Sequence, residues 1–204
     1  MQKQSNYFPE LTRVRQLTNA YCGPAVLQML LSFYSFWTAQ GHIIDAAQVS
    51  RRIDEHGTTI PDLARAMTIL APHFSFWYKD HSIIDDLYTI VEKHHVPVGV
   101  EWQGIFGDDY SVDYDGHYSI VTHVDLEEGS LMIADPYPDF AGRDRRFSIV
   151  EFNKRWWDYN EIEDHQTGKT ESIRDERMMF IVAEPSATFP AELGMKLWDS
   201  ALTR

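Results

Sequence analysis

The apolar pattern of this chain changes half-way along the sequence, and this change limits the folds that are open to it. In the first half, apolar residues recur at helical spacing between helix-ending residues such as Gly57 and Pro72. In the second half, short alternating segments rich in β-branched and aromatic residues take over. Helices followed by strands predict an α+β domain, in which an antiparallel sheet packs against the N-terminal helices.

The pattern also predicts individual elements. We expect helices over residues 22–34, 43–55, 60–71 and 82–93, and a short helix over 148–157. Strands are expected over residues 74–78, 97–102, 117–124, 131–134 and 177–183. Thr18 or Asn19 is the expected cap of the first helix, and Ser82 is the expected cap of the fourth.

The length of the chain, 204 residues, is enough for one domain with a sizeable core. We expect residues 1–204 to form this single domain, with a core over 16–183, an irregular arm over 1–15 and a tail over 184–204. The arm has no apolar segment typical of a secretory signal, and no apolar run approaches the ~20 residues of a membrane-spanning helix. We therefore predict a cytoplasmic protein.

Acidic side chains dominate the charge of the chain. There are 31 Asp and Glu residues against 18 Lys and Arg, which gives a formal net charge of −13. Phosphate backbones and anionic membranes attract proteins through basic faces, so this balance argues against nucleic acid or a membrane as the partner. The acidity favours either basic substrates or, more simply, solubility.

Cys22 is the only cysteine, which excludes an intrachain disulfide. Pro24 follows two residues later, and because proline is tolerated only in the first turn of a helix, Cys22 is expected at the helix N-terminus. The helix dipole places roughly half a positive charge at that end, and this charge favours a thiolate. On this feature alone, Cys22 is either a nucleophile or a buried structural cysteine.

Two further residues are candidates for a thiol-dependent site. His117 opens one expected strand and Asp135 ends the next, so they are a candidate base and a candidate orienting carboxylate. A simple hairpin that turns near Gly129 places Asp135 opposite about residue 122, roughly five residues from His117. In that register, a hydrogen bond between them requires a bulge or another pairing.

Gln16 lies six residues before Cys22. A glutamine amide at this position can donate an N–H to an oxyanion and so complement the backbone N–H of Cys22 at the helix start. Gln16 is therefore the candidate oxyanion-hole residue.

The segment from Gln16 through Tyr21-Cys22-Gly23-Pro24-Ala25 resembles the nucleophile motif of papain-like peptidases, specifically of the bacteriocin-processing (double-glycine leader) peptidase family. Further segments resemble the same family in order and spacing, and the resemblance spans about residues 16–183. These segments are 57–59 with 62–63, 97–100, Gly116-His117-Tyr118-Ser119-Ile120-Val121, Ala134-Asp135-Pro136-Tyr137, and Phe152 with Trp156.

The resemblance implies a papain-like fold and a cysteine peptidase. It implies that Cys22 is the nucleophile, His117 the base, Asp135 the orienting acid and Gln16 the oxyanion-hole donor, and that Asp135 reaches His117. A peptide or protein is then the expected partner, and no cofactor is expected. An amidase or an acyltransferase would use the same site, and a non-catalytic peptide-binding module would keep the same fold.

The sequence departs from the family pattern at three points. Tyr21 stands where the family often has an acidic residue, and residues 103–115 form a longer, acidic insertion. We interpret residues 105–113 as a candidate lid or specificity element. The transporter that commonly carries this domain is not seen in the sequence, so leader removal during export is not expected.

The main alternative interpretation of the histidines is that they bind a metal ion. His94, His95, His117 and His123 do not have the spacing of a zinc motif, and the chain has one cysteine. The loop around Asp113 lacks the first and twelfth ligands of a calcium loop. We therefore expect no metal.

Overall fold

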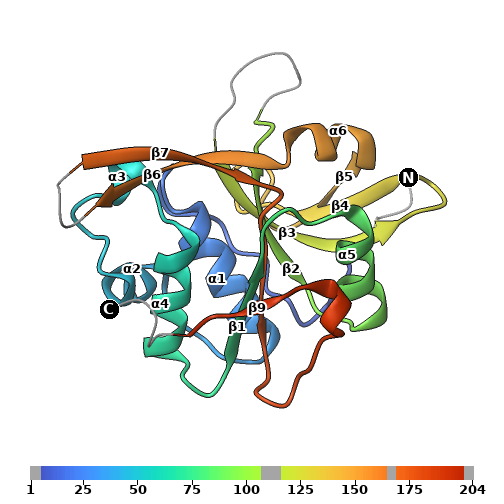
Figure 1. The fold of residues 1–204 in the computed structure, drawn as a ribbon, viewed down its shortest axis with the longest axis horizontal. Coiled ribbons are helices and arrows are strands. Elements are labelled where there is room, and N and C mark those ends of the chain that lie inside the picture. Colours follow the sequence, from blue (N-terminus) through green and yellow to red (C-terminus); the bar gives the residue numbers. More distant parts are fainter. Residues whose placement is uncertain (1–5, 107–115, 165–168, 200–204) are drawn as a thin grey trace.

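A computed structural model of the chain describes residues 6–106, 116–164 and 169–199 (Figure 1). The insertion at 103–115, and with it the candidate lid, lies mostly outside the described residues. The helices and helical turns are α1 (Cys22–Phe33), α2 (Gln40–Ala47), α3 (Ile53–His56), α4 (Ile60–Leu70), α5 (Ile84–Tyr88), the π-helical turn η1 (Thr89–Lys93), α6 (Ile149–Arg155) and the 3-10 turn η2 (Ala191–Leu193). None of the described helices is long and apolar enough to cross a membrane.

Most strands belong to one antiparallel sheet. Its strands are β1 (Ser75–Lys79), β2 (Val98–Gln103), β3 (Gly116–Asp125), β4 (Ser130–Ala134), β5 (Asp144–Ser148), β8 (Met179–Ala183) and β9 (Lys196–Leu197). They lie in the order β5-β4-β3-β2-β8-β1-β9, and β6 (Trp157–Asp164) pairs with β7 (Lys169–Glu176) in a separate hairpin. The predicted α+β arrangement, with helices first and an antiparallel sheet second, is confirmed (Figure 1).

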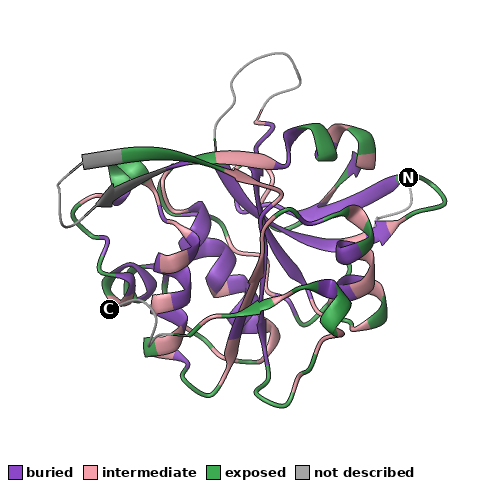
Figure 2. Ribbon diagram, viewed as in Figure 1, coloured by how far each residue is buried: buried purple, intermediate pink, exposed green. Residues whose placement is uncertain are grey.

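The sheet has an apolar core on each face. Along β8, Phe180 and Val182 join the core beneath α1, α2 and α4, while Met179 and Ile181 join the core beneath α5, η1 and α6. This alternation follows from the two-residue period of a strand. Figure 2 shows that α1 and the central strands are buried, whereas much of the described part of the β6–β7 hairpin is exposed.

Two of the early helices begin or end differently from the prediction. The expected helix over 43–55 is broken because Gln48 takes a left-handed conformation, with φ 60° and ψ 34°, and closes α2. Both Val49 and Ile53, which follow the break, are buried in the first core. The expected cap of the fourth helix, α5, is also wrong. Asp86 accepts the N–H of Ile83 at 2.8 Å, and the hydroxyl of Ser82 donates to the carbonyl of Lys79 instead.

The other predicted helices and strands are present close to their expected residue ranges. The start of α4 is fixed by Thr59 and Asp62, whose side chains each accept the backbone N–H of the other residue, at 3.4 and 2.9 Å. This reciprocal capping box places Pro61 in the first turn, where its missing N–H costs nothing. Strands β5, β6, β7 and β9 were not predicted, since their segments carry charges in place of an alternating apolar pattern.

Candidate active site

Cys22 is the first residue of α1, as predicted, and its side chain is buried with 8% of the residue exposed. The N-cap is Tyr21, whose side chain makes no capping hydrogen bond. The predicted caps are wrong, because the Thr18 hydroxyl accepts the N–H of Ala20 instead. The first N–H groups of α1 therefore point to the candidate site without a side-chain cap.

Gly23 lets α1 approach its neighbours closely. A Cβ atom at this position would lie 2.1 Å from Oγ1 of Thr58 and 3.3 Å from the ring of Tyr118. The first contact is too short for any side chain, so Gly23 is required for the position of Cys22 against β3. Oγ1 of Thr58 is buried, and it has no hydrogen-bond partner within the described part of the chain.

His117 and Asp135 are in direct contact. His117 lies near the start of β3, and its Nε2 is 2.8 Å from Oδ1 of Asp135; each residue is 2% exposed. Asp135 follows directly on the last residue of β4. The contact that the family resemblance implied is thus present, and the simple hairpin register was wrong.

The true register explains how the two residues meet. Ile120 pairs with Ala134 and Val121 with Ile133, but the next pair is His123 with Met132. The register of the two strands therefore shifts by one residue between Val121 and His123. The bulge and the turn after Asp125 together bring Asp135 next to the part of β3 that begins with His117. Asp125 holds this turn, because its Oδ1 accepts the N–H of Glu128 at 2.8 Å.

The electrostatics of His117 favour its charged form. Burial lowers the pKa of His117, but the charge and hydrogen bond of Asp135, followed by the hydrogen bond and charge of the Cys22 side chain, outweigh it and raise the pKa to about 10. Since Nε2 faces Asp135, Nδ1 is the ring nitrogen that remains for the thiol. The fold therefore brings Cys22, His117 and Asp135 together, and the raised pKa of His117 favours its protonated form.

Gln16 is buried beside these residues, with 2% exposed. Its backbone N–H donates to the carbonyl of Pro136 at 2.9 Å, which ties it to the loop after Asp135. Its Nε2 donates to the carbonyls of Thr18 and Asn19, while its buried Oε1 has no partner among the described residues. An N–H directed at an oxyanion requires the amide to rotate, and the oxyanion role of Gln16 stays a prediction.

The sequence model of the Peptidase C39-like family matches residues 8–163. This chain belongs to that family. No curated protein matches the sequence of this C39-like chain.

Two solved structures share the fold of the C39-like chain. The peptidase domain of Streptococcus ComA, a bi-functional ABC transporter involved in a quorum sensing pathway, has a TM-score of 0.56 at 20% identity, over 85% of this chain and 98% of that one. A double glycine motif protease from an AMS/PCAT transporter, solved in complex with the leader peptide, has a TM-score of 0.54 at 15% identity, over 89% and 96%. The predicted papain-like fold is confirmed.

Arg145 is a residue of the candidate site that no sequence pattern had singled out. Its Nη1 donates to Oδ2 of Asp135 at 2.7 Å, and its Nη2 donates to the carbonyl of Ile105 at 3.0 Å. The guanidinium also lies over the ring of Phe140, 3.4 Å from its centroid. No motif signals this arginine, because it reaches Asp135 only through the pairing of β4 with β5.

Asp135 is held in its ionised form by several donors. Burial raises the pKa of Asp135, but the charge and hydrogen bond of His117, the N–H of Tyr137 and the charge of Arg145 outweigh it and hold the pKa below its usual 3.8. A carboxylate that stays charged and has both oxygens bonded keeps the imidazole in one orientation.

A second buried polar group lies beside Tyr118, the residue after His117. Glu101 on β2 is 1% exposed, and its Oε1 accepts the hydroxyl of Tyr118 at 2.6 Å and Nδ2 of Asn160 at 3.0 Å. Burial, followed by the charge of Asp158, raises the pKa of Glu101 to about 8. This network joins β2 and β3 to the β6–β7 hairpin. A lone glutamate within an apolar strand was its only signal in the sequence.

Asp158 of β6 packs directly against the residue before His117. A Cβ atom on Gly116 would lie 2.1 Å from Oδ2 of Asp158, so glycine is required there. Nε2 of Gln103 donates to Oδ1 of Asp158 at 2.7 Å. Burial raises the pKa of Asp158 to about 6. A carboxylate from the hairpin therefore lies beside the candidate base.

Of the described residues, no three His, Cys, Asp or Glu side chains are grouped so that they hold a metal ion. The histidines considered as metal ligands have other neighbours. His117 contacts Asp135, and His123 contacts Glu92 at 2.8 Å.

Proposed function

We propose that this chain is a cysteine peptidase that cleaves a peptide or amide bond through a thioester on Cys22. The observation that carries the proposal is the buried His117–Asp135 pair, whose second ring nitrogen is left for the thiol at the start of α1. Membership of a peptidase family supports the same reaction. The related protease solved with a leader peptide supports a peptide as the substrate class.

The reaction follows from these positions. The thiolate of Cys22 attacks the carbonyl carbon, a C–S bond forms, and the uncapped N–H groups of α1 stabilise the oxyanion, with Gln16 as the second donor once its amide rotates. The C–N bond breaks as His117 gives its proton to the leaving amine. Water then loses a proton to His117 and attacks the thioester, which releases the acid and the thiolate. Asp135 keeps the imidazole oriented throughout.

The same thioester also serves an amidase or an acyltransferase, because these enzymes differ only in the leaving group or the acceptor. A non-catalytic peptide-binding module is less well supported, since it has no need of a charged imidazole beside a buried thiol. The proposal includes a cytoplasmic location, where a lone thiol stays reduced.

The first test is the rate of Cys22 alkylation by iodoacetamide between pH 4 and 10. We expect Cys22 to react with iodoacetamide at acidic pH, because the charged imidazole of His117 stabilises the reactive thiolate. His117→Ala should remove this low-pH reactivity, whereas His42→Ala, which changes an exposed histidine on α2, should not. Cys22→Ala gives the background.

An equal pH profile in wild type and His117→Ala would mean an inert thiol, and the binding module would replace the enzyme. If the low-pH reactivity is present, a mixed peptide library analysed by mass spectrometry identifies the bonds cleaved. Hydrolysis should fall as the pH rises through about 10, where His117 loses the proton that the leaving amine requires. Alkylation should not fall there, since it requires only the thiolate.

A further inference from the structure

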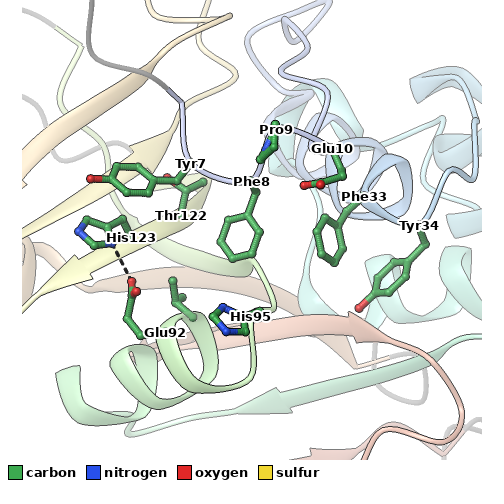
Figure 3. A pocket seen from close by; sticks show the side chains of 11 residues that line it. Tyr7, Phe8, Pro9, Glu10, Phe33, Tyr34, Glu92, His95, Thr122 and His123 are labelled. Atoms are coloured by element: carbon green, nitrogen blue, oxygen red, sulfur yellow. Dashed lines mark hydrogen bonds and ion pairs between the residues drawn. The ribbon is translucent and has the colours of Figure 1, made fainter. Parts of the chain in front are cut away.

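A cavity of about 590 Å³ lies at the opposite end of α1 from Cys22. Its walls come from the N-terminal arm, the end of α1, η1 and the far part of β3 (Figure 3). This volume falls within the range of roughly 300–1,000 Å³ that is typical of small-molecule sites.

The cavity is separate from the candidate active site. Phe33, which lines it, is the last residue of α1, and Cys22 is the first, so the two lie about 16 Å apart along the helix axis. His123 lines it on β3, six residues after His117, which is about 20 Å along a strand. A ligand in this cavity therefore does not touch the candidate catalytic residues.

Aromatic rings form much of the wall. Phe8 and Phe33 meet edge to face with their centroids 5.5 Å apart, and Tyr34 lies next to Phe33 at 4.9 Å. The ring of Tyr7 stacks on His123 at 4.0 Å. Figure 3 shows Phe8 between the stacked pair of Tyr7 and His123 and the rings of Phe33 and Tyr34. Aromatic surfaces of this kind accept flat apolar groups, and their faces attract cations.

The charged groups in the wall are mostly acidic. Glu10 and Glu92 both line the cavity, and none of its eleven lining residues is a lysine or an arginine. Glu92 uses one oxygen, Oε1, to accept from His123 and from the N–H of Val124, each at 2.8 Å. The Tyr34 hydroxyl already donates to the carbonyl of Val182. The wall has two basic side chains, His95 and His123, and His123 is directed at Glu92.

We propose that this cavity binds an organic cation that carries a flat apolar body, such as an arylalkylamine. The rings bury the apolar body, and the carboxylates of Glu10 and Glu92 attract the ammonium group. The net charge of −13 attracts the same class of ligand from solution and disfavours anions. This inference does not depend on the proposed peptidase activity.

The test compares three indoles of nearly the same shape with the full chain, by isothermal titration calorimetry. Tryptamine is a cation, tryptophol is neutral, and indole-3-propionate is an anion. We expect tryptamine to bind with a Kd below about 1 mM, and at least tenfold more tightly than tryptophol, because only a positively charged ligand is attracted by the carboxylates that line the cavity. Indole-3-propionate should bind most weakly.

Matched variants locate the binding. Glu10→Lys should weaken tryptamine binding about tenfold and leave tryptophol binding nearly unchanged, since Glu10 is exposed at the cavity and the change reverses its charge. Glu127→Lys makes the same change of net charge in the exposed turn between β3 and β4, and it should have little effect. Phe33→Leu should weaken both ligands.

A further control separates the cavity from the candidate active site. Protein in which Cys22 has been alkylated with iodoacetamide should bind tryptamine with an unchanged Kd. Loss of binding after alkylation would place the ligand at Cys22 and overturn the inference. Equal affinity for the three indoles, equal effects of Glu10→Lys and Glu127→Lys, or no binding at 10 mM ligand would overturn it as well.

Discussion

Arg145 is expected to affect the rate of the proposed reaction through its contact with Asp135. It donates to the oxygen of Asp135 that does not face His117, and its own side chain is only 16% exposed. Because Phe140 stacks on the guanidinium, the arginine has little freedom to turn away. Arg145 is therefore a positioning residue, which acts on His117 through Asp135.

Arg145→Met should lower kcat for the proposed hydrolysis by about 10- to 100-fold with little change in KM, because a small displacement of the imidazole misaligns proton transfer. The acid limb of the pH–rate profile should also move to higher pH, since the pKa of Asp135 rises when the arginine charge is lost. Arg145→Lys should recover part of the rate.

The matched control for this prediction is Arg146→Met on the same strand. Arg146 is half exposed and pairs with the exposed Glu128, so its loss should change neither kcat nor the pH profile. If the two methionine variants behave alike, Arg145 has no positioning role.

At the scale of elements, the N-terminal arm has no helix or strand among its described residues, yet it is firmly attached to the sheet. Asp144 on β5 accepts from the N–H of Tyr7, from the guanidinium of Arg13 and from the hydroxyl of Thr122. The side chains of Arg13 and Asp144 are 6% and 1% exposed. The buried carboxylate of Asp144 thus helps to attach the arm to the sheet, and the attached arm places Tyr7 and Phe8 in the wall of the cavity.

Arg13→Met should lower the free energy of unfolding by about 3 kcal/mol, because it leaves the buried carboxylate of Asp144 without its cation. The double variant Arg13→Met with Asp144→Asn should recover part of this loss. Urea unfolding measures both changes. Arg15→Met, which changes an exposed arginine two residues away, should leave the free energy of unfolding nearly unchanged. Equal losses for Arg13→Met and Arg15→Met would contradict the proposed attachment.

At the scale of the whole molecule, Glu101 links stability to pH. From β2 it bonds to Tyr118 on β3 and to Asn160 in the β6–β7 hairpin. Burial, followed by the charge of Asp158, raises its pKa from 4.5 to about 8. The folded protein therefore keeps a proton on Glu101 that the unfolded chain releases above pH 4.5. The stabilisation from this proton is complete below pH 4.5 and is lost as the pH rises through 8.

Glu101→Gln should remove this part of the pH dependence, because a neutral amide replaces the protonated acid. The variant should gain free energy of unfolding relative to wild type as the pH rises from 4.5 to 8, as measured by urea unfolding at several pH values. Glu127→Gln, at an exposed site, should follow the wild-type curve. Parallel curves for wild type and Glu101→Gln would show that Glu101 does not carry the effect.

Some features of this protein are determined by the sequence alone, because the signals that encode them are local. Pro24 and the apolar run after it determine where α1 begins, and Thr59 with Asp62 determines the start of α4. Local signals of this kind also singled out Cys22, His117, Asp135 and Gln16, together with the α+β class. The family resemblance added the expected contact between His117 and Asp135.

Other features were decided only by the tertiary structure, because they depend on residues that are distant in sequence. The irregular pairing of β3 with β4 decides which residue lies opposite which, and a one-residue shift in a strand moves every side chain to the other face. Arg145, Glu101 and Asp144 meet their partners only after the strands have paired. The cavity likewise exists only where four separate segments come together, and no local pattern encodes such a meeting.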